Sequence, residues 1–241
     1  MKHILKSVCP KGLTEYLSAN PCATWENFCN EAQEAHKIVQ AIIKEDQLGI
    51  CCYCEIDFHV SDKSPIKDFR VEHFYPKSQT PLPDTGENAH LTWSNLLGCC
   101  HGGTEHFYND DERFTDKRHR HCDAPKGEKD WTKIILNPLN IPEDTTIFTF
   151  ETDGTIKVSA KCPPDLKTLA QNSIEKLNLN ESTYLKKARK SVRDAIEYEF
   201  YKLRQSGLTE QESLDFLKNA LFASTAINMK FYTCKLDYVS Y

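Results

Sequence analysis

Apolar residues recur at helical spacing between Thr24 and Gln47; they are Trp25, Phe28, Ala32, Ala35, Val39, Ile42 and Ile43. Thr24 is a residue type that caps helix starts, and Gly49 is a common stop signal just beyond the apolar series. We therefore predict one amphipathic helix over residues 24–47, leading into the centre of the chain.

Beyond Trp131 the sequence again has ordinary secondary-structure periodicity. Residues 146–151 and 155–160 read as two strands joined across Asp153-Gly154, which is a hairpin signal. Three helices are expected after the hairpin, over 165–177, 182–205 and 209–229. The last begins with Thr209-Glu210-Gln211-Glu212, a capping-box pattern.

Residues 50–127 differ from both flanks because they are rich in Cys, His, Gly, Pro and aromatic residues. Such a segment cannot build much aliphatic core, so a bound metal is expected to hold it together. Within it, 69–74 suggests a strand, 79–90 a loop and 91–97 a short apolar element. The expected organisation is an N-terminal helical segment (1–49), a metal-stabilised core (50–135) and a hairpin plus helical region (136–241).

The composition is that of an ordinary water-soluble protein, with 39% hydrophobic and 27% charged residues among 241. No apolar run approaches the length of a membrane span, and residues 1–10 lack a signal-peptide core. A cytoplasmic location without membrane contact is expected. The net charge of −5 argues against an autonomous, tight nucleic-acid binder, although local basic clusters occur around 117–133 and 186–193.

The eleven cysteines favour metal ligation over disulfides, because the number is odd and five of them lie at 51, 52, 54, 99 and 100. Cys51 and Cys54 form a Cys-x-x-Cys pair that can chelate one ion from a tight turn. The two further ligands could be any of several downstream residues: Cys99, Cys100, His101, His106, His119, His121 and Cys122. The scattered cysteines at 9, 22, 29, 162 and 234 are expected to be small buried residues.

Three further segments contain residues that could carry chemistry. Glu72-His73 precedes Phe-Tyr-Pro-Lys, Asn95 precedes Leu-Leu-Gly-Cys-Cys, and Cys122-Asp123 precedes Ala-Pro-Lys-Gly. Adjacent strand residues point to opposite faces, so Glu72 and His73 need a turn or bulge to share one site. Alone, the Glu-His pair fits better with an exposed strand that carries a solvated Glu and a half-buried His.

In this order, the four segments resemble the HNH nuclease family. Family spacing implies a structural zinc bound by Cys51, Cys54, Cys100 and Cys122, in an α+β fold with a ββα-metal core. The sequence departs from the usual family pattern in two ways: an insertion over 101–121 separates Cys100 from Cys122, and Asp123 follows the last cysteine. A histidine at 106, 119 or 121 could therefore replace one zinc cysteine.

The resemblance also implies catalytic roles. His73 would be the general base that activates water, and Asn95 would hold the loop that orients it. Glu72 and Asp123 would bind a catalytic Mg²⁺ or Mn²⁺. Lys77 and Lys126 would contact the nucleic acid, which could be DNA or RNA.

A narrower resemblance is to the Septu-type HNH subunits known as PtuB, whose relatives accompany retrons. It rests on the wording Cys-Cys-Tyr-Cys-Glu, Val-Glu-His-Phe-Tyr-Pro-Lys, Trp-Ser-Asn-Leu-Leu and His-Cys-Asp-x-x-Lys-Gly, and on the flanking helical regions. It implies antiviral defence in bacteria with an ABC-type ATPase partner of the PtuA kind. In a retron setting, a reverse transcriptase and its RNA-linked DNA are expected as well.

Two other functions compete with the nuclease. A catalytically silent zinc module for assembly would need the four cysteines but would have no use for Glu72, His73 and Asp123 together. A zinc hydrolase would need an open coordination position, which four thiolates do not leave.

Overall fold

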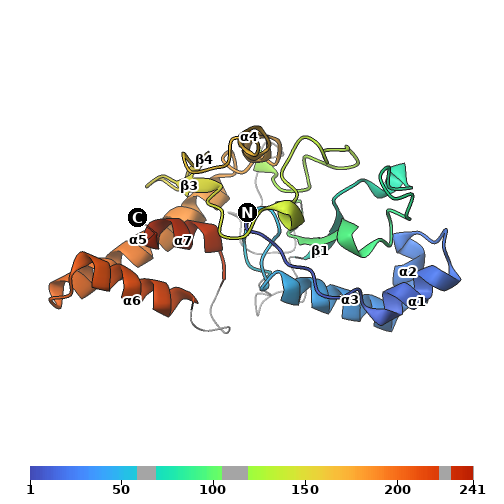
Figure 1. Ribbon diagram of the computed structural model, residues 1–241, viewed down its shortest axis with the longest axis horizontal. Coiled ribbons are helices and arrows are strands. Elements are labelled where there is room, and N and C mark those ends of the chain that lie inside the picture. The colour runs from blue at the N-terminus through green and yellow to red at the C-terminus, as the bar shows by residue number, and fades with distance from the viewer. Residues whose placement is uncertain (59–68, 105–118, 223–228, 241) are drawn as a thin grey trace.

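The structure is a computed structural model that describes residues 1–58, 69–104, 119–222 and 229–240. Helices dominate, with two small antiparallel sheets, so the fold is α+β as expected. Figure 1 shows an elongated molecule with α1–α3 at one end, α5–α7 at the other, and the sheets with α4 between them. None of the helices in the described ranges is both long enough and apolar enough to span a membrane.

The N-terminal region contains three helices where the sequence predicts one. They are α1 (Lys11–Ala19), α2 (Trp25–Glu31) and α3 (Gln33–Asp46). Thr24 caps α2 as predicted. The backbone leaves helical geometry at Ala32 (φ −124°, ψ 50°), however, so the prediction of a single helix over 24–47 was wrong. The break lets the three helices enclose one apolar cluster that contains Leu13, Phe28 and Val39.

The central sheet consists of β1 (Arg70–His73) and β2 (Leu96–Cys99), which confirms the predicted strand. The strands pair residue for residue, with Glu72 opposite Leu97 and His73 opposite Leu96. The segment after Cys122 forms consecutive turns rather than a helix: the amides of Lys126 and Gly127 both donate to the Asp123 carbonyl, at 3.0 and 2.9 Å. The two strands of the expected ββα arrangement are therefore observed, whereas turns take the place of its helix.

The C-terminal region begins with a hairpin of β3 (Phe148–Phe150) and β4 (Ile156–Val158), as predicted. Three of the four helices that follow were also predicted, and the capping box of Thr209 and Glu212 is present. Part of the third predicted helix, 223–228, lies outside the described residues. The helices are α4 (Lys167–Lys176), α5 (Thr183–Gln205), α6 (Glu210–Phe222) and the unpredicted α7 (Tyr232–Val239).

The second basic cluster, at 186–193, is used largely within the fold. Lys186 pairs with Asp153 at 2.9 Å, and Lys190 with Asp194 at 2.5 Å. Arg193 donates to the Phe150 carbonyl at 2.9 Å, and Arg189 is buried. Lys186 and Arg193 therefore attach α5 to the hairpin segment, whereas the pair of Lys190 and Asp194 lies within the helix.

The largest hydrophobic cluster joins all three predicted regions. It contains Ile4 from the first, Cys51 and Leu97 from the second, and Ile174 and Phe231 from the third. The regions 50–135 and 136–241 therefore share one core, in which the cysteine-rich segment is central.

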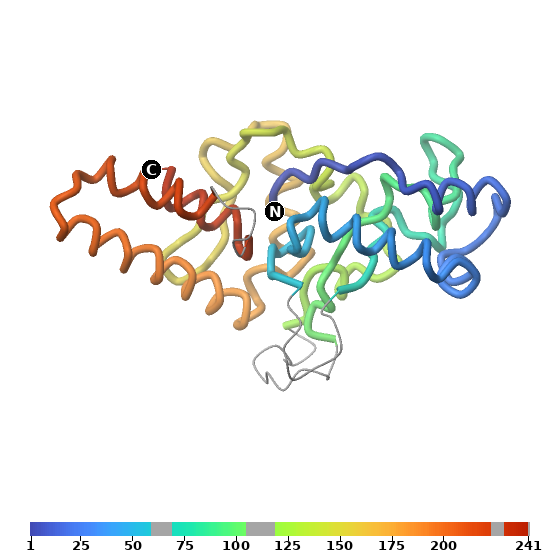
Figure 2. Tube along the Cα trace, turned by 90° about the horizontal axis from the view of Figure 1, so that it is seen from below, coloured from blue at the N-terminus to red at the C-terminus, as the bar shows by residue number. Residues whose placement is uncertain are grey.

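A second connection links the loop before β2 to the N-terminal helices. The Asn88 side-chain amide donates to the carbonyls of Pro21 and Ala23, at 3.0 and 2.8 Å. The amide of Trp25, the first residue of α2, donates to Nδ1 of His90 at 3.2 Å. Figure 2 shows this loop beside α1 and α2 at one end of the molecule.

Candidate active site and metal centre

The structure brings together the four cysteines that family spacing selects. Cys51 and Cys54 lie in the turn after α3, Cys100 follows β2, and Cys122 comes from the far side of the long insertion. All four are buried and free, and their sulfur atoms lie within 4.8 Å of one another.

The spacing of these sulfur atoms fits one tetrahedral ion. The Sγ–Sγ distances are 3.8 Å for Cys51–Cys122, 3.7 Å for Cys54–Cys100 and 3.6 Å for Cys100–Cys122. A tetrahedral zinc with Zn–S bonds of about 2.3 Å requires neighbouring sulfurs about 3.8 Å apart. The four thiols therefore match a zinc site in both number and geometry.

Other candidate ligands lie outside this group. Cys99 contacts Cys51 (Sγ–Sγ 3.8 Å) and forms a second group of thiols with Cys51 and Cys52. His121 is buried with its Nδ1 3.3 Å from the His119 carbonyl, whereas His119 contacts Thr183 at 2.9 Å. Among the described residues the four-member group holds only cysteines, and His106 lies outside those residues.

The scattered cysteines are only partly as expected. Cys162 and Cys234 are buried, Cys9 and Cys29 are half-buried, and Cys22 is exposed. The prediction was wrong for Cys22 because this residue lies in the turn between α1 and α2 rather than under a helix.

Glu72 is the centre of a buried polar group on one side of β1. Its Oε1 accepts a hydrogen bond from the Tyr53 hydroxyl at 3.1 Å and pairs with the Lys126 ammonium at 2.9 Å. Burial raises the pKa of Glu72, the charge of Asp123 adds to this shift, and Lys126 opposes it. The carboxyl is thus held by two donors in a site of low polarity.

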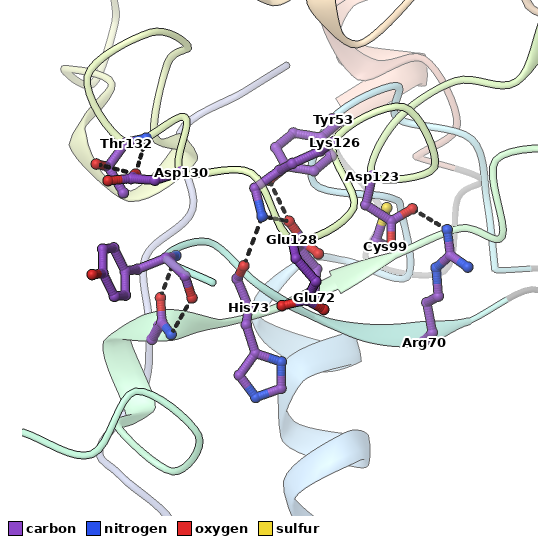
Figure 3. Close-up of polar contacts among 12 residues, drawn as sticks. Tyr53, Arg70, Glu72, His73, Cys99, Asp123, Lys126, Glu128, Asp130 and Thr132 are labelled. Atoms are coloured by element: carbon purple, nitrogen blue, oxygen red, sulfur yellow. Dashed lines mark hydrogen bonds and ion pairs between the residues drawn. The ribbon is translucent and has the colours of Figure 1, made fainter. Parts of the chain in front are cut away.

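Asp123 lies beside Glu72 and has its own basic partner. Its Oδ1 pairs with the guanidinium of Arg70, at the start of β1. Burial raises the pKa of Asp123, and Arg70 works against this shift. Figure 3 shows Asp123, Tyr53 and Lys126 gathered on one side of the strand.

His73 occupies the other side of β1. Its imidazole packs edge-on against Trp25 of α2 (centroids 5.4 Å apart), and Nε2 lies 3.1 Å from the His90 carbonyl. Burial lowers the pKa of His73 to about 4, so the imidazole is neutral at pH 7. Because β1 pairs regularly with β2, Glu72 and His73 point to opposite sides, as Figure 3 shows.

Asn95 joins the two ends of the loop between the strands. Its Oδ1 accepts the amide hydrogen of Tyr75 at 2.7 Å, and its Nδ2 donates to the carbonyls of Tyr75 and Ala89, at 3.0 and 2.7 Å. Both polar atoms of the Asn95 side chain therefore bond the backbone. Their partners are Tyr75, two residues after His73, and Ala89, one residue before His90.

The two lysines expected at the nucleic acid have different environments. Lys77 is half-buried near His73 and pairs with Glu26 of α2. Lys126 is only 1% exposed and donates to the His73 carbonyl at 3.0 Å as well as pairing with Glu72. The predicted contact of Lys126 with the nucleic acid at the surface is thus wrong, because its ammonium bonds two groups inside the site.

Sequence comparison places the chain in a known family. The chain matches no protein-family model. An Escherichia coli protein with the name 'Retron Ec83 putative HNH endonuclease' is 35% identical over 201 residues, which are 75% of this chain and 74% of that protein. The chain belongs to the HNH endonuclease family. It is a nuclease that hydrolyses phosphodiester bonds.

The carboxylates of this HNH endonuclease suit a hard divalent cation. Glu72 and Asp123 lie close enough for their charges to repel, and each uses a single oxygen, Oε1 or Oδ1, in its hydrogen bonds to described residues. The second oxygen of each is an appropriate donor for Mg²⁺ or Mn²⁺. The donor set therefore fits the metal dependence of the family.

Sequence reasoning missed four residues around this HNH site. Arg70 could have been found, because it lies two residues before Glu72 and so shares its face of the strand. Tyr53 lies between Cys52 and Cys54, where the residue pattern indicates metal ligation and gives no sign of a contact with Glu72. His90 and Trp25 carried no signal, because they meet His73 only through the fold.

Proposed function

We propose that this HNH endonuclease cleaves DNA or RNA with His73 as general base, beside a divalent cation held by Glu72 and Asp123. The observation that carries the proposal is the anchoring of His73. The His90 carbonyl can only accept a hydrogen bond, so Nε2 of His73 carries the proton. In the neutral imidazole Nδ1 then has a free lone pair, which is the form a base needs to activate water.

A Mg²⁺ or Mn²⁺ ion bound there would stabilise the negative charge that develops on the phosphate and the leaving oxygen. Tyr53 and Lys126 orient Glu72 through its Oε1, and Arg70 orients Asp123 through its Oδ1. Each carboxylate is thereby fixed with one oxygen left for the ion.

Lys126 connects the two neighbours from the Glu72 side of β1, because its ammonium bonds the Glu72 carboxylate and the backbone carbonyl of His73. We assign Lys126 to positioning these two neighbours and Asn95 to holding the loop that follows His73. Lys77 remains the proposed contact to the nucleic-acid backbone.

The zinc proposed at Cys51, Cys54, Cys100 and Cys122 has a structural role. Four thiolates fill a tetrahedral shell and leave no position for water, so catalysis does not use this ion. Within the proposed organisation (1–49, 50–135 and 136–241), the zinc fixes β2 and the Asp123 turn relative to each other.

We further propose that the protein is the PtuB-like effector of a Septu or retron defence system in bacteria, controlled by an ABC-type ATPase. Support comes from the motif wording and from the retron Ec83 protein at 35% identity. The net charge of −5 also favours a partner that supplies part of the nucleic-acid grip. A retron reverse transcriptase and its RNA-linked DNA would complete such a complex.

The first experiment measures phosphodiester cleavage of DNA and RNA in Mg²⁺ or Mn²⁺, with and without the candidate ATPase. Wild type is compared with His73→Ala, and His36→Ala serves as the control because His36 packs on the same Trp25 ring, at 5.3 Å. We expect His73→Ala to be folded, zinc-loaded and inactive, and His36→Ala to be active.

Three results would contradict the proposal. Cleavage by His73→Ala at the wild-type rate would remove the general base. Loss of zinc from His73→Ala would contradict the separation of structural and catalytic metals. Inactivity of folded, zinc-loaded wild type with its ATPase would favour the zinc assembly module instead.

A further inference from the structure

His90 is held rigidly beside the proposed general base. Its carbonyl oxygen lies 3.1 Å from Nε2 of His73, and its amide donates to Oδ1 of Asn88 at 2.9 Å. Its own Nδ1 accepts the amide hydrogen of Trp25 at 3.2 Å. Backbone and side chain of His90 are thus fixed by three separate hydrogen bonds.

These bonds determine which nitrogen of His90 carries the proton. A backbone amide can only donate, so Nδ1 has a lone pair directed at Trp25. The proton of the neutral imidazole is then on Nε2. Within the described part of the chain no residue hydrogen-bonds to this nitrogen, and the His90 side chain is half-exposed.

The ring that carries this Nε2–H lies close to the proposed general base, His73. The two imidazole centroids are 6.3 Å apart, with their planes at 71°. Lys77 and Glu26 act electrostatically on both rings, so all four side chains share one region. His73 itself is only 7% exposed, whereas His90 is half-exposed.

We propose that His90 is a further catalytic residue, whose Nε2–H donates a hydrogen bond to a non-bridging oxygen of the scissile phosphate. A fixed donor at this oxygen stabilises the charge that develops in the transition state without reorganising. None of the motifs discussed above includes His90. The inference rests on the proposed role of His73.

Substitutions at this one position separate catalysis from structure. In His90→Asn, Oδ1 occupies the place of Nδ1 and keeps the bond to the Trp25 amide, but the Nε2–H donor is lost. In His90→Gln, the amide nitrogen can replace the Nε2–H donor, while the acceptor for Trp25 is lost. The carbonyl that anchors His73 is present in every variant, because it belongs to the backbone.

The test measures kcat, KM and thermal unfolding for wild type, His90→Asn, His90→Gln and His90→Ala. We expect His90→Asn and His90→Ala to lose about 10²–10³-fold in kcat, the effect of removing one transition-state donor, with little change in KM. His90→Gln should retain more activity than His90→Asn. His90→Asn should also keep the wild-type unfolding temperature.

A merely structural His90 gives the reverse order, with His90→Asn cleaving like wild type and above His90→Gln; that order would overturn the inference. His73→Ala in the same assay tests the proposed function separately from the role of His90. An active His73→Ala overturns the proposed function itself. An inactive His73→Ala together with a fully active His90→Asn overturns only the role of His90.

Discussion

Lys126 carries its ammonium in the interior, between the Glu72 carboxylate and the His73 carbonyl. A buried ion pair contributes little net stability, but removing one partner leaves the other charged and without compensation. The asymmetry makes Lys126 more important to the site than its neighbour Lys129, whose exposed ammonium donates to the Pro125 carbonyl and lies 5.5 Å from the centroid of the Trp131 ring.

Lys126→Ala should therefore lower the free energy of unfolding by about 3–5 kcal/mol, because Glu72 is left buried without its cation. Lys129→Ala is the matched control and should change it by no more than about 0.5 kcal/mol. Urea denaturation measures both. Equal stabilities of the two variants would mean that Glu72 is neutral or solvated without Lys126.

Asn95 offers a second prediction at this scale. Asn95→Ala removes all three side-chain hydrogen bonds to Tyr75 and Ala89 and leaves buried backbone groups unpaired. We expect the free energy of unfolding to fall by about 1–3 kcal/mol per unpaired group, and cleavage to slow because the loop that follows His73 loosens. Denaturation and cleavage assays should show the exposed Asn20→Ala unchanged; intact cleavage by Asn95→Ala would contradict the positioning role.

Among the secondary-structure elements, the turn after β2 controls the approach of Cys100 to Cys122. Gly102 has φ +57°, and a Cβ there would lie 2.1 Å from the carbonyl oxygen of His121, directly before Cys122. The Cβ would push the two cysteine-bearing segments apart. Gly127 has a similar φ of +52° but open space around it.

Gly102→Ala should thus lose zinc affinity and stability, whereas Gly127→Ala should lose only the left-handed backbone cost of about 1–2 kcal/mol. Zinc content after dialysis against a chelator distinguishes the variants. Full zinc retention by Gly102→Ala would show that the turn can move without opening the thiol group.

The regular elements were predictable where local pattern decides them. The hairpin follows from its Asp-Gly turn, the strand at β1 from its alternating residues, and the start of α5 from the Ser182 cap. The break at Ala32 could not be predicted, because local propensity supports a continuous helix and only the shared apolar cluster bends it. Similarly, motif spacing selected the four cysteines, whereas the burial of Lys126 and the anchoring of His73 by His90 depend on tertiary contacts.

For the molecule as a whole, the cysteine group lies inside the main hydrophobic cluster, next to residues of the C-terminal region. Arg189 of α5 is 2% exposed beside these thiols, where burial lowers the pKa of its guanidinium to about 10 and the charges of Cys54 and Cys122 act against this. The metal is therefore expected to stabilise both the centre and the C-terminal helices.

Removing the metal should unfold both parts in one transition. We expect Cys54→Ala to lose zinc and show lower helicity and a displaced Trp131 emission, since Trp131 belongs to the same cluster. Cys162→Ala, which removes a buried thiol outside the group, should keep its zinc. Circular dichroism and metal analysis decide; native helicity without zinc would indicate a C-terminal region that folds independently.

The hydrogen bonds from Asn88 to Pro21 and Ala23, and from Trp25 to His90, have a consequence for control of the enzyme. The loop that carries His90 cannot shift without the α1–α2 connection, so displacement of one is transmitted to the other. A protein bound to the outer surface of α1 and α2 would therefore contact the same hydrogen-bonded unit that holds His90, without entering the catalytic centre.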